Sequence, residues 1–184
     1  MKPARIPVVM LCTLGLLTAV SVVLGTALSI KAFAIGGGYT LEISLNVLPV
    51  ILAGYLYGPA AGLIVGFVAN LIKWAMTGAG AFNPFIALSM GFMGATPAFV
   101  ARIIHKRTDD AKRNTVPAMR TIFIGVFVGQ TVFSLVVNTV LLHVMYGTPY
   151  MGLIPQRAIN AAVMIPVYAW LTRECLRMLA RIKN

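Results

Sequence analysis

Acidic residues are scarce in this chain. Only 4 of its 184 residues are Asp or Glu, and charged residues of both signs make up 10%. A soluble globular chain carries about a quarter charged residues. Four acids cannot cover a water-exposed surface of this size. The composition therefore excludes a soluble enzyme domain and indicates that lipid is the solvent of this chain.

Catalytic and metal-binding motifs are also missing. The chain has no G-x-x-x-x-G-K-[ST] phosphate loop, no G-x-S-x-G or H-E-x-x-H motif and no Cys/His cluster. Its two cysteines, Cys12 and Cys175, are too few for a disulfide framework, and we expect His105 and His143 on opposite sides of the membrane. These observations predict that the chain has no metal and no cofactor, and that it is not an enzyme.

Carboxylates that could form a proton or sodium relay are likewise missing: apart from Glu42 at the start of the second apolar segment, none lies in the apolar segments. The only aspartates, Asp109 and Asp110, lie in a basic stretch between two apolar segments. Transporters that relay protons use carboxylates inside the membrane. We therefore expect a chain that binds a substrate and depends on a partner for energy.

Long apolar runs are what the chain has instead. Hydrophobic residues make up 59% of it, and the mean hydropathy is +0.90. One spanning helix needs about 20 apolar residues. Glycine, proline and charge divide the chain into six apolar segments, at about 6–30, 40–57, 60–77, 83–104, 121–145 and 153–171. This pattern predicts a single domain over residues 1–184: an all-α integral membrane protein, folded as a compact bundle of six transmembrane helices.

The cations predict how the bundle is oriented. The net charge is +11, and twelve of the 15 Lys and Arg residues lie in the stretches 2–5, 102–120 and 173–183. Six spans place these stretches on one side, which the positive-inside rule makes cytoplasmic. We expect both termini in the cytoplasm and interpret the charge as an orientation signal, not as a surface for nucleic acid.

Three cations, Lys31, Lys73 and Arg157, do not follow that rule, and all three are expected near the outer end of the bundle. Lys31 is at a segment end, where a long side chain reaches the headgroups. Lys73 and Arg157 lie about one turn deeper, where either snorkelling or a binding role fits.

Amide side chains are predicted in the same outer half, among them Asn83, Asn138, Gln156 and Asn160. Singly, each could be a contact between helices. Together with the two deeper cations they predict a polar pocket that opens to the outside and suits a carboxylate, because lipid leaves buried polar groups without partners.

Small residues recur at four-residue spacing, which lets helix backbones pack closely. Gly15 and Ala19 show it in the first segment, Gly62 and Gly66 in the third. Most such pairs are expected to pack inside the bundle.

Several short motifs follow one another in a fixed order: Ile43-Ser44, Leu48-Pro49, Ala53-Gly54 and Tyr57-Gly58-Pro59. Further along come Phe82-Asn83-Pro84-Phe85, Asn138-Thr139, Tyr146-Gly147-Thr148-Pro149 and Leu153-Ile154-Pro155-Gln156-Arg157. In this order the motifs span nearly the whole chain. They resemble those of the substrate-binding S components of energy-coupling factor (ECF) vitamin transporters, specifically the folate-type group.

The resemblance implies a multi-pass protein of the bacterial plasma membrane with an outward-facing vitamin pocket, partly covered by the first outer loop. It also implies a transmembrane coupling protein (the T component) and two ABC ATPases as partners, with delivery by toppling of the loaded subunit in the membrane. Gly15 and Ala19 match the small-residue pattern that meets the coupling protein in that group. The expected substrate-binding residues are Tyr39, Lys73, Asn83, Phe85, Asn138, Gln156, Arg157 and Asn160.

Departures from the group bear on the vitamin. Many folate-type members have Asp at the position of Asn70 and Lys at that of Asn160, and a Pro-Gly-Phe-Thr stretch where this chain has Asn83-Pro84-Phe85-Ile86. Few aromatic residues are predicted at the outer end, whereas a pterin needs a stacking site. We therefore expect pantothenate or folate, with a preference for the smaller monocarboxylate, pantothenate. The alternative is an intramembrane enzyme or membrane assembly factor that binds no vitamin.

Overall fold

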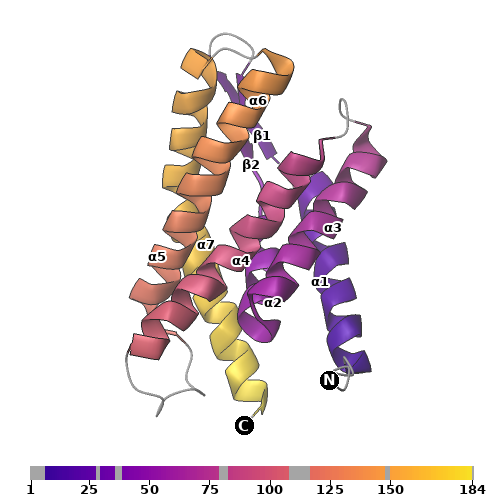
Figure 1. The fold of residues 1–184 in the computed structure, drawn as a ribbon, viewed down its shortest axis with the longest axis vertical. Helices are drawn as coiled ribbons and strands as arrows, with labels where there is room; N and C mark the ends of the chain where they lie inside the picture. The colour runs from indigo at the N-terminus through magenta and orange to yellow at the C-terminus, as the bar shows by residue number, and fades with distance from the viewer. Residues whose placement is uncertain are drawn as a thin grey trace.

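A computed structural model describes residues 7–27, 30–35, 39–78, 83–107, 117–147 and 150–183. Its helices form six segments: α1 (Val8–Thr26), α2 (Val47–Tyr57), α3 (Pro59–Thr77), α4 (Pro84–Arg107), a continuous fifth segment and α7 (Tyr150–Lys183). The fifth segment joins α5 (Met119–Gly129), the π-helix η2 (Gln130–Val137) and α6 (Asn138–Tyr146). The described chain begins and ends at the same end of the bundle (Figure 1). This confirms the predicted six-helix fold.

Four of the helical segments are long and apolar enough to cross a membrane: α1, α3, α4 and the fifth segment. With 11 residues, α2 is about 17 Å long and covers only part of a bilayer. The 34 residues of α7 are more than enough to cross, and its last turns carry the basic tail as helix. The predicted sixth segment therefore ended too early, because hydropathy follows the lipid boundary and not the helix end.

The sequence prediction was wrong between α1 and α2. The expected connection and the adjoining ends of the two expected helices, at residue 30 and residues 40–43, form two antiparallel strands, β1 (Ile30–Ile35) and β2 (Tyr39–Ile43), with Ile30 paired to Ile43. The signal was present, because β-branched and aromatic residues flank the Gly36-Gly37-Gly38 stretch on both sides. The helices are correspondingly shorter, and the strands lie toward the end of the bundle opposite the termini (Figure 1).

A single glycine allows the tight connection of α2 to α3 that the sequence predicted. Gly58 has φ 105°, a conformation that L side chains rarely adopt, and Pro59 then begins α3. A Cβ built on Gly58 would lie 2.5 Å from Nη2 of Arg102 in α4. The turn therefore lies beside the cationic C-terminal part of α4, at the end of the bundle where the termini are.

Glycines bring the backbones of α2, α3 and α4 into contact. A Cβ on Gly91 would lie 2.5 Å from the carbonyl oxygen of Leu63, and one on Gly62 would lie 2.8 Å from that of Gly94. This confirms the internal packing predicted for Gly62 from the four-residue spacing, and Gly91 packs in the same way.

The short helix α2 lies at the centre of the molecule. Val50 and Ile51 are fully buried, and α2 contacts α1, α3, α4 and α7. Apolar side chains on the outer helices face outward, as Val8 of α1 does with 74% of its surface exposed. The buried centre and apolar exterior are what a helical protein in lipid requires.

Candidate functional site

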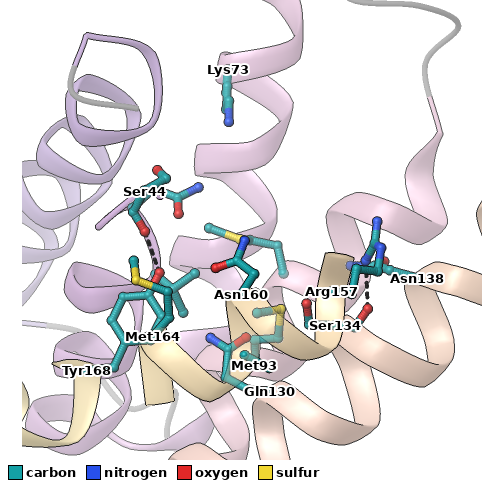
Figure 2. Close-up of a pocket in the computed structure, with 14 residues that line it drawn as sticks. Ser44, Lys73, Met93, Gln130, Ser134, Asn138, Arg157, Asn160, Met164 and Tyr168 are labelled. Carbon is teal, nitrogen blue, oxygen red and sulfur yellow. Dashed lines mark hydrogen bonds between the residues drawn. The ribbon is translucent and has the colours of Figure 1, made fainter. Parts of the chain in front are cut away.

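A cavity of about 400 Å³ lies at the N-terminal end of α2. Its volume falls in the range of small-molecule sites, roughly 300–1,000 Å³. Its walls come from the segment after β2 and from α2, α3, α4, the π-helix, α6 and α7. They consist of Ser44, Asn46, Val47, Lys73, Met90, Met93, Gln130, Ser134, Asn138, Arg157, Asn160, Ala161, Met164 and Tyr168 (Figure 2).

Two cations line the cavity from different helices. Lys73 extends from α3 toward the space that Asn160 faces, while Arg157 of α7 lies beside Ser134 and Asn138 (Figure 2). None of the described lining residues is an Asp or Glu. The cavity is therefore electropositive, and it favours a ligand with an anionic group.

The π-helix and the first residue of α6 form one polar wall. Gln130, Ser134 and Asn138 follow one another at four-residue spacing, and all three line the cavity. Nη1 of Arg157 donates a hydrogen bond to the carbonyl oxygen of Ser134 at 2.6 Å. Oδ1 of Asn138 is buried and has no hydrogen-bond partner among the described residues. This wall therefore offers an acceptor to a ligand N–H or O–H group.

Tyr168 closes the cavity on the α7 side. It is 3% exposed, and its hydroxyl donates to the carbonyl oxygen of Ser44, the residue that follows β2. Ser21 of α1 donates to the carbonyl oxygen of Asn46 at 2.6 Å. These bonds hold the segment between β2 and α2 against α7 and α1, so the cavity wall there is fixed by two different helices.

The rest of the lining is apolar and adaptable. Met90 and Met93 of α4 and Met164 of α7 are buried at the cavity. Methionine side chains are unbranched and flexible, so they fit around irregular apolar groups. Tyr168 is the one aromatic residue among the described lining residues.

Four of the eight substrate-site residues expected from sequence line the cavity: Lys73, Asn138, Arg157 and Asn160. The described walls do not include Asn83 or Phe85. Asn83 instead precedes α4, where its Oδ1 accepts the N–H of Phe85 at 3.0 Å, and Phe85 is 57% exposed. The side chains of Tyr39 and Gln156 lie outside the described part of the structure.

Sequence reasoning missed several lining residues, and two periodic signals could have found them. In α7, Ala161, Met164 and Tyr168 continue the helix face that begins at Arg157. In the fifth segment, Gln130 and Ser134 precede Asn138 at intervals of four.

The other expected features can also be placed. The described residues contain no group of three or more His, Cys, Asp or Glu side chains that could hold a metal. Gly15 and Ala19 are both exposed on α1, and no atom lies within 4 Å of a Cβ built on Gly15. In contrast to Gly62 and Gly91, Gly15 therefore has no packing partner within the described chain.

Known proteins resemble this chain in sequence. Residues 6–173 match the family described as the ECF-type riboflavin transporter, S component. The folate transporter FolT of Clostridium novyi (strain NT) is 24% identical over 143 residues, which are 78% of this chain and 77% of that protein. The riboflavin transporter RibU of Staphylococcus aureus (strain TCH60) is 27% identical over 156 residues, 77% of this chain and 78% of that one.

Solved structures resemble it in fold. An S component of a bacterial ECF transporter matches with a TM-score of 0.63 and 25% identity, over 92% of this chain and 96% of that one. FolT bound with folic acid matches with a TM-score of 0.68 and 17% identity, over 88% and 89% of the two chains.

These relatives carry the names of different vitamins, so they do not single out the folate-type group. The family match does decide against the alternative of an intramembrane enzyme, because S components are binding subunits of transporters. The chain thus belongs to the S components of ECF transporters: it is a multi-pass protein of the bacterial plasma membrane that binds a vitamin for transport.

Proposed function

We propose that this S component captures a carboxylate-bearing vitamin from outside the cell in the cavity beside α2, and that the vitamin is pantothenate. The observation that carries the proposal is that Lys73 and Arg157 both line one cavity, which has no acid among its described lining residues. Two half-buried cations that line one cavity attract a carboxylate more strongly than they would in bulk water.

Pantothenate matches the rest of the lining. It has one carboxylate, an amide, two hydroxyl groups and a small branched apolar group. The amide and hydroxyl groups suit Asn138, Asn160 and Gln130, and the apolar group suits the methionines. Among the described lining residues, only Tyr168 has an aromatic ring on which a large flat ligand ring could stack. The hydroxyl of Tyr168 already donates to the carbonyl oxygen of Ser44.

Folate is the second candidate. Two cations in one cavity would match the two carboxylates of folate, and FolT proteins are among the relatives in sequence and fold. Riboflavin, named in the matching family, has no carboxylate. The three vitamins therefore make different demands on Lys73 and Arg157.

Energy for delivery comes from partners in this proposal. The sequence has no phosphate loop, so a T component and two ABC ATPases supply the nucleotide-driven step. The exposed Gly15 and Ala19 on α1 offer a close-packing surface to the T component. The loaded subunit topples in the membrane against that module and turns its cavity to the cytoplasm.

The test begins with the purified full-length protein in detergent. Mass spectrometry identifies the ligand it releases, and calorimetry measures binding of pantothenate, folate, riboflavin and biotin without ATP. We expect tight binding of pantothenate and a loss of about 30-fold or more in Arg157→Gln, because removing one partner of a buried charge pair costs about 2–5 kcal/mol.

Arg120→Gln is the matched control, since Arg120 is an exposed arginine of α5 away from the cavity. It should bind like the wild type. Undiminished binding of every vitamin acid by Arg157→Gln would refute the site. Binding of riboflavin alone would refute the carboxylate class, and folate in place of pantothenate would select the second candidate.

A further inference from the structure

The π-helix changes which backbone carbonyl is available at the cavity. In an α-helix, the N–H of Asn138 would donate to the carbonyl oxygen of Ser134, four residues earlier. Here that N–H donates to the carbonyl oxygen of Phe133, five residues earlier. The Asn138 N–H thus does not bond the Ser134 carbonyl oxygen. Nη1 of Arg157 donates to that oxygen at 2.6 Å.

This bond joins two segments far apart in sequence at the point where both line the cavity (Figure 2). A carbonyl in the membrane interior needs a donor, and the guanidinium group supplies one to a carbonyl that the Asn138 N–H does not bond. A guanidinium group carries five N–H donors in one rigid plane. Fixing one nitrogen on Ser134 restricts the orientation of that plane and leaves other donors for a ligand.

We propose that the π-helix positions Arg157 for carboxylate recognition by presenting the Ser134 carbonyl as its anchor. The inference rests on the proposed function, and it makes Ser134 a positioning residue that acts through its backbone. The extra residue in the turn is therefore a determinant of specificity. With regular α-helical bonding through this segment, the Asn138 N–H would occupy the Ser134 carbonyl, and Arg157 would keep its charge without a fixed direction.

Direction and charge have different consequences for selectivity. A mobile cation attracts any anion at short range, whereas an oriented guanidinium donates two parallel hydrogen bonds to one carboxylate. The positioning should therefore appear as preference for an acid over its neutral analogue. Suitable probes are pantothenate and the alcohol obtained by reducing its carboxylate.

Backbone esters in the full-length chain test this directly. Replacing Leu135 by its α-hydroxy acid turns the Ser134 carbonyl into an ester carbonyl, a weaker acceptor, and leaves every side chain unchanged. The same replacement at Val136 is the matched control: it also removes one N–H from the π-helix, but it weakens the Leu135 carbonyl instead. Both are made with Arg157 and with Arg157→Gln, and both probes are titrated.

We expect the ester at Ser134 to lower the acid-over-alcohol preference about five- to tenfold more than the control ester does, as for loss of a charge-assisted hydrogen bond. The difference should disappear in Arg157→Gln, because the effect passes through that side chain. Equal effects of the two esters, or a difference that persists without Arg157, would overturn the inference.

Arg157→Lys provides a second variant that does not depend on a backbone change. It keeps the charge but cannot hold the Ser134 carbonyl and both carboxylate oxygens in one plane. It should lose most of the preference, and a lysine variant with the wild-type preference contradicts the inference. Failure of the proposed function is visible separately, because the wild type would then bind no carboxylate vitamin at all.

Discussion

At the scale of single residues, buried polar atoms without partners distinguish binding groups from packing groups. Asn138 Oδ1 and Thr172 Oγ1 are both buried and have no hydrogen-bond partner among the described residues. Asn138 lines the cavity, whereas Thr172 is fully buried in α7 and does not. An unsatisfied buried polar group costs about 1–3 kcal/mol, a cost that a ligand can remove only at Asn138.

Asn138→Leu should weaken vitamin binding at least about tenfold while leaving the thermal unfolding temperature equal to or above that of the ligand-free wild type. The substitution removes the unpaired Oδ1 of Asn138 and, with it, the cost of burying that oxygen without a hydrogen bond. Calorimetry and thermal unfolding in detergent measure the two effects.

The matched control is Thr172→Val, which removes a buried hydroxyl away from the cavity and keeps nearly the same side-chain size. It should raise or preserve stability and leave binding unchanged. A fall in binding equal to that of Asn138→Leu would show that both substitutions act through the fold. Unchanged binding in Asn138→Leu would remove Asn138 from the site.

At the scale of the elements, close contacts among α2, α3 and α4 hold the wall from which Lys73, Met90 and Met93 reach the cavity. A Cβ on Gly91 would meet backbone of α3, which cannot move aside as a side chain can. Gly15 of α1 belongs to a motif with the same four-residue spacing, but a Cβ built on it would contact no backbone of another helix. Equal motifs in the sequence therefore have opposite structural roles.

Gly91→Ala should destabilise the bundle by about 1–3 kcal/mol, because overpacking forces two helices apart. Gly15→Ala should leave stability unchanged or slightly raised. Alanine has a higher helix propensity than glycine, and no atom lies within 4 Å of a Cβ built at this position. Thermal unfolding of both variants in the same detergent compares them. Equal stabilities of the two would contradict the close approach of α3 and α4.

At the scale of the whole molecule, the face of α1 that carries Gly15 and Ala19 is exposed, and no residue of α1 is among the described lining residues of the cavity. Replacing both Gly15 and Ala19 by leucine should keep vitamin binding within about twofold, and it should abolish co-purification with the T component and ATPases. Bulky side chains prevent the close backbone approach that small residues allow.

Binding by calorimetry and co-purification of the coexpressed complex separate the two activities. The matched control is a leucine substitution at Ala60, an exposed residue of α3, which should affect neither. Intact complex formation by the Gly15 and Ala19 double variant would refute the proposed contact with the T component.

Part of the site could be predicted from the sequence because membrane helices carry few polar residues. Lys73, Asn138, Arg157 and Asn160 stood out against an apolar background, and all four line the cavity. Asn83 stood out for the same reason, yet its Oδ1 accepts the N–H of Phe85 at the start of α4. Polarity indicates that a side chain needs a partner, and only the structure shows whether backbone supplies it.

The sequence by itself determined the solvent of this protein, its six helical segments and the charge asymmetry between its ends, because these depend on composition and order along the chain. The tertiary structure decided the strand pair before α2, the short central α2 and the set of residues that meet at the cavity. It also decided that the Asn138 N–H bonds one carbonyl further back and leaves Ser134 to Arg157. Those features depend on contacts between distant segments, and hydrophobic periodicity along one helix does not contain them.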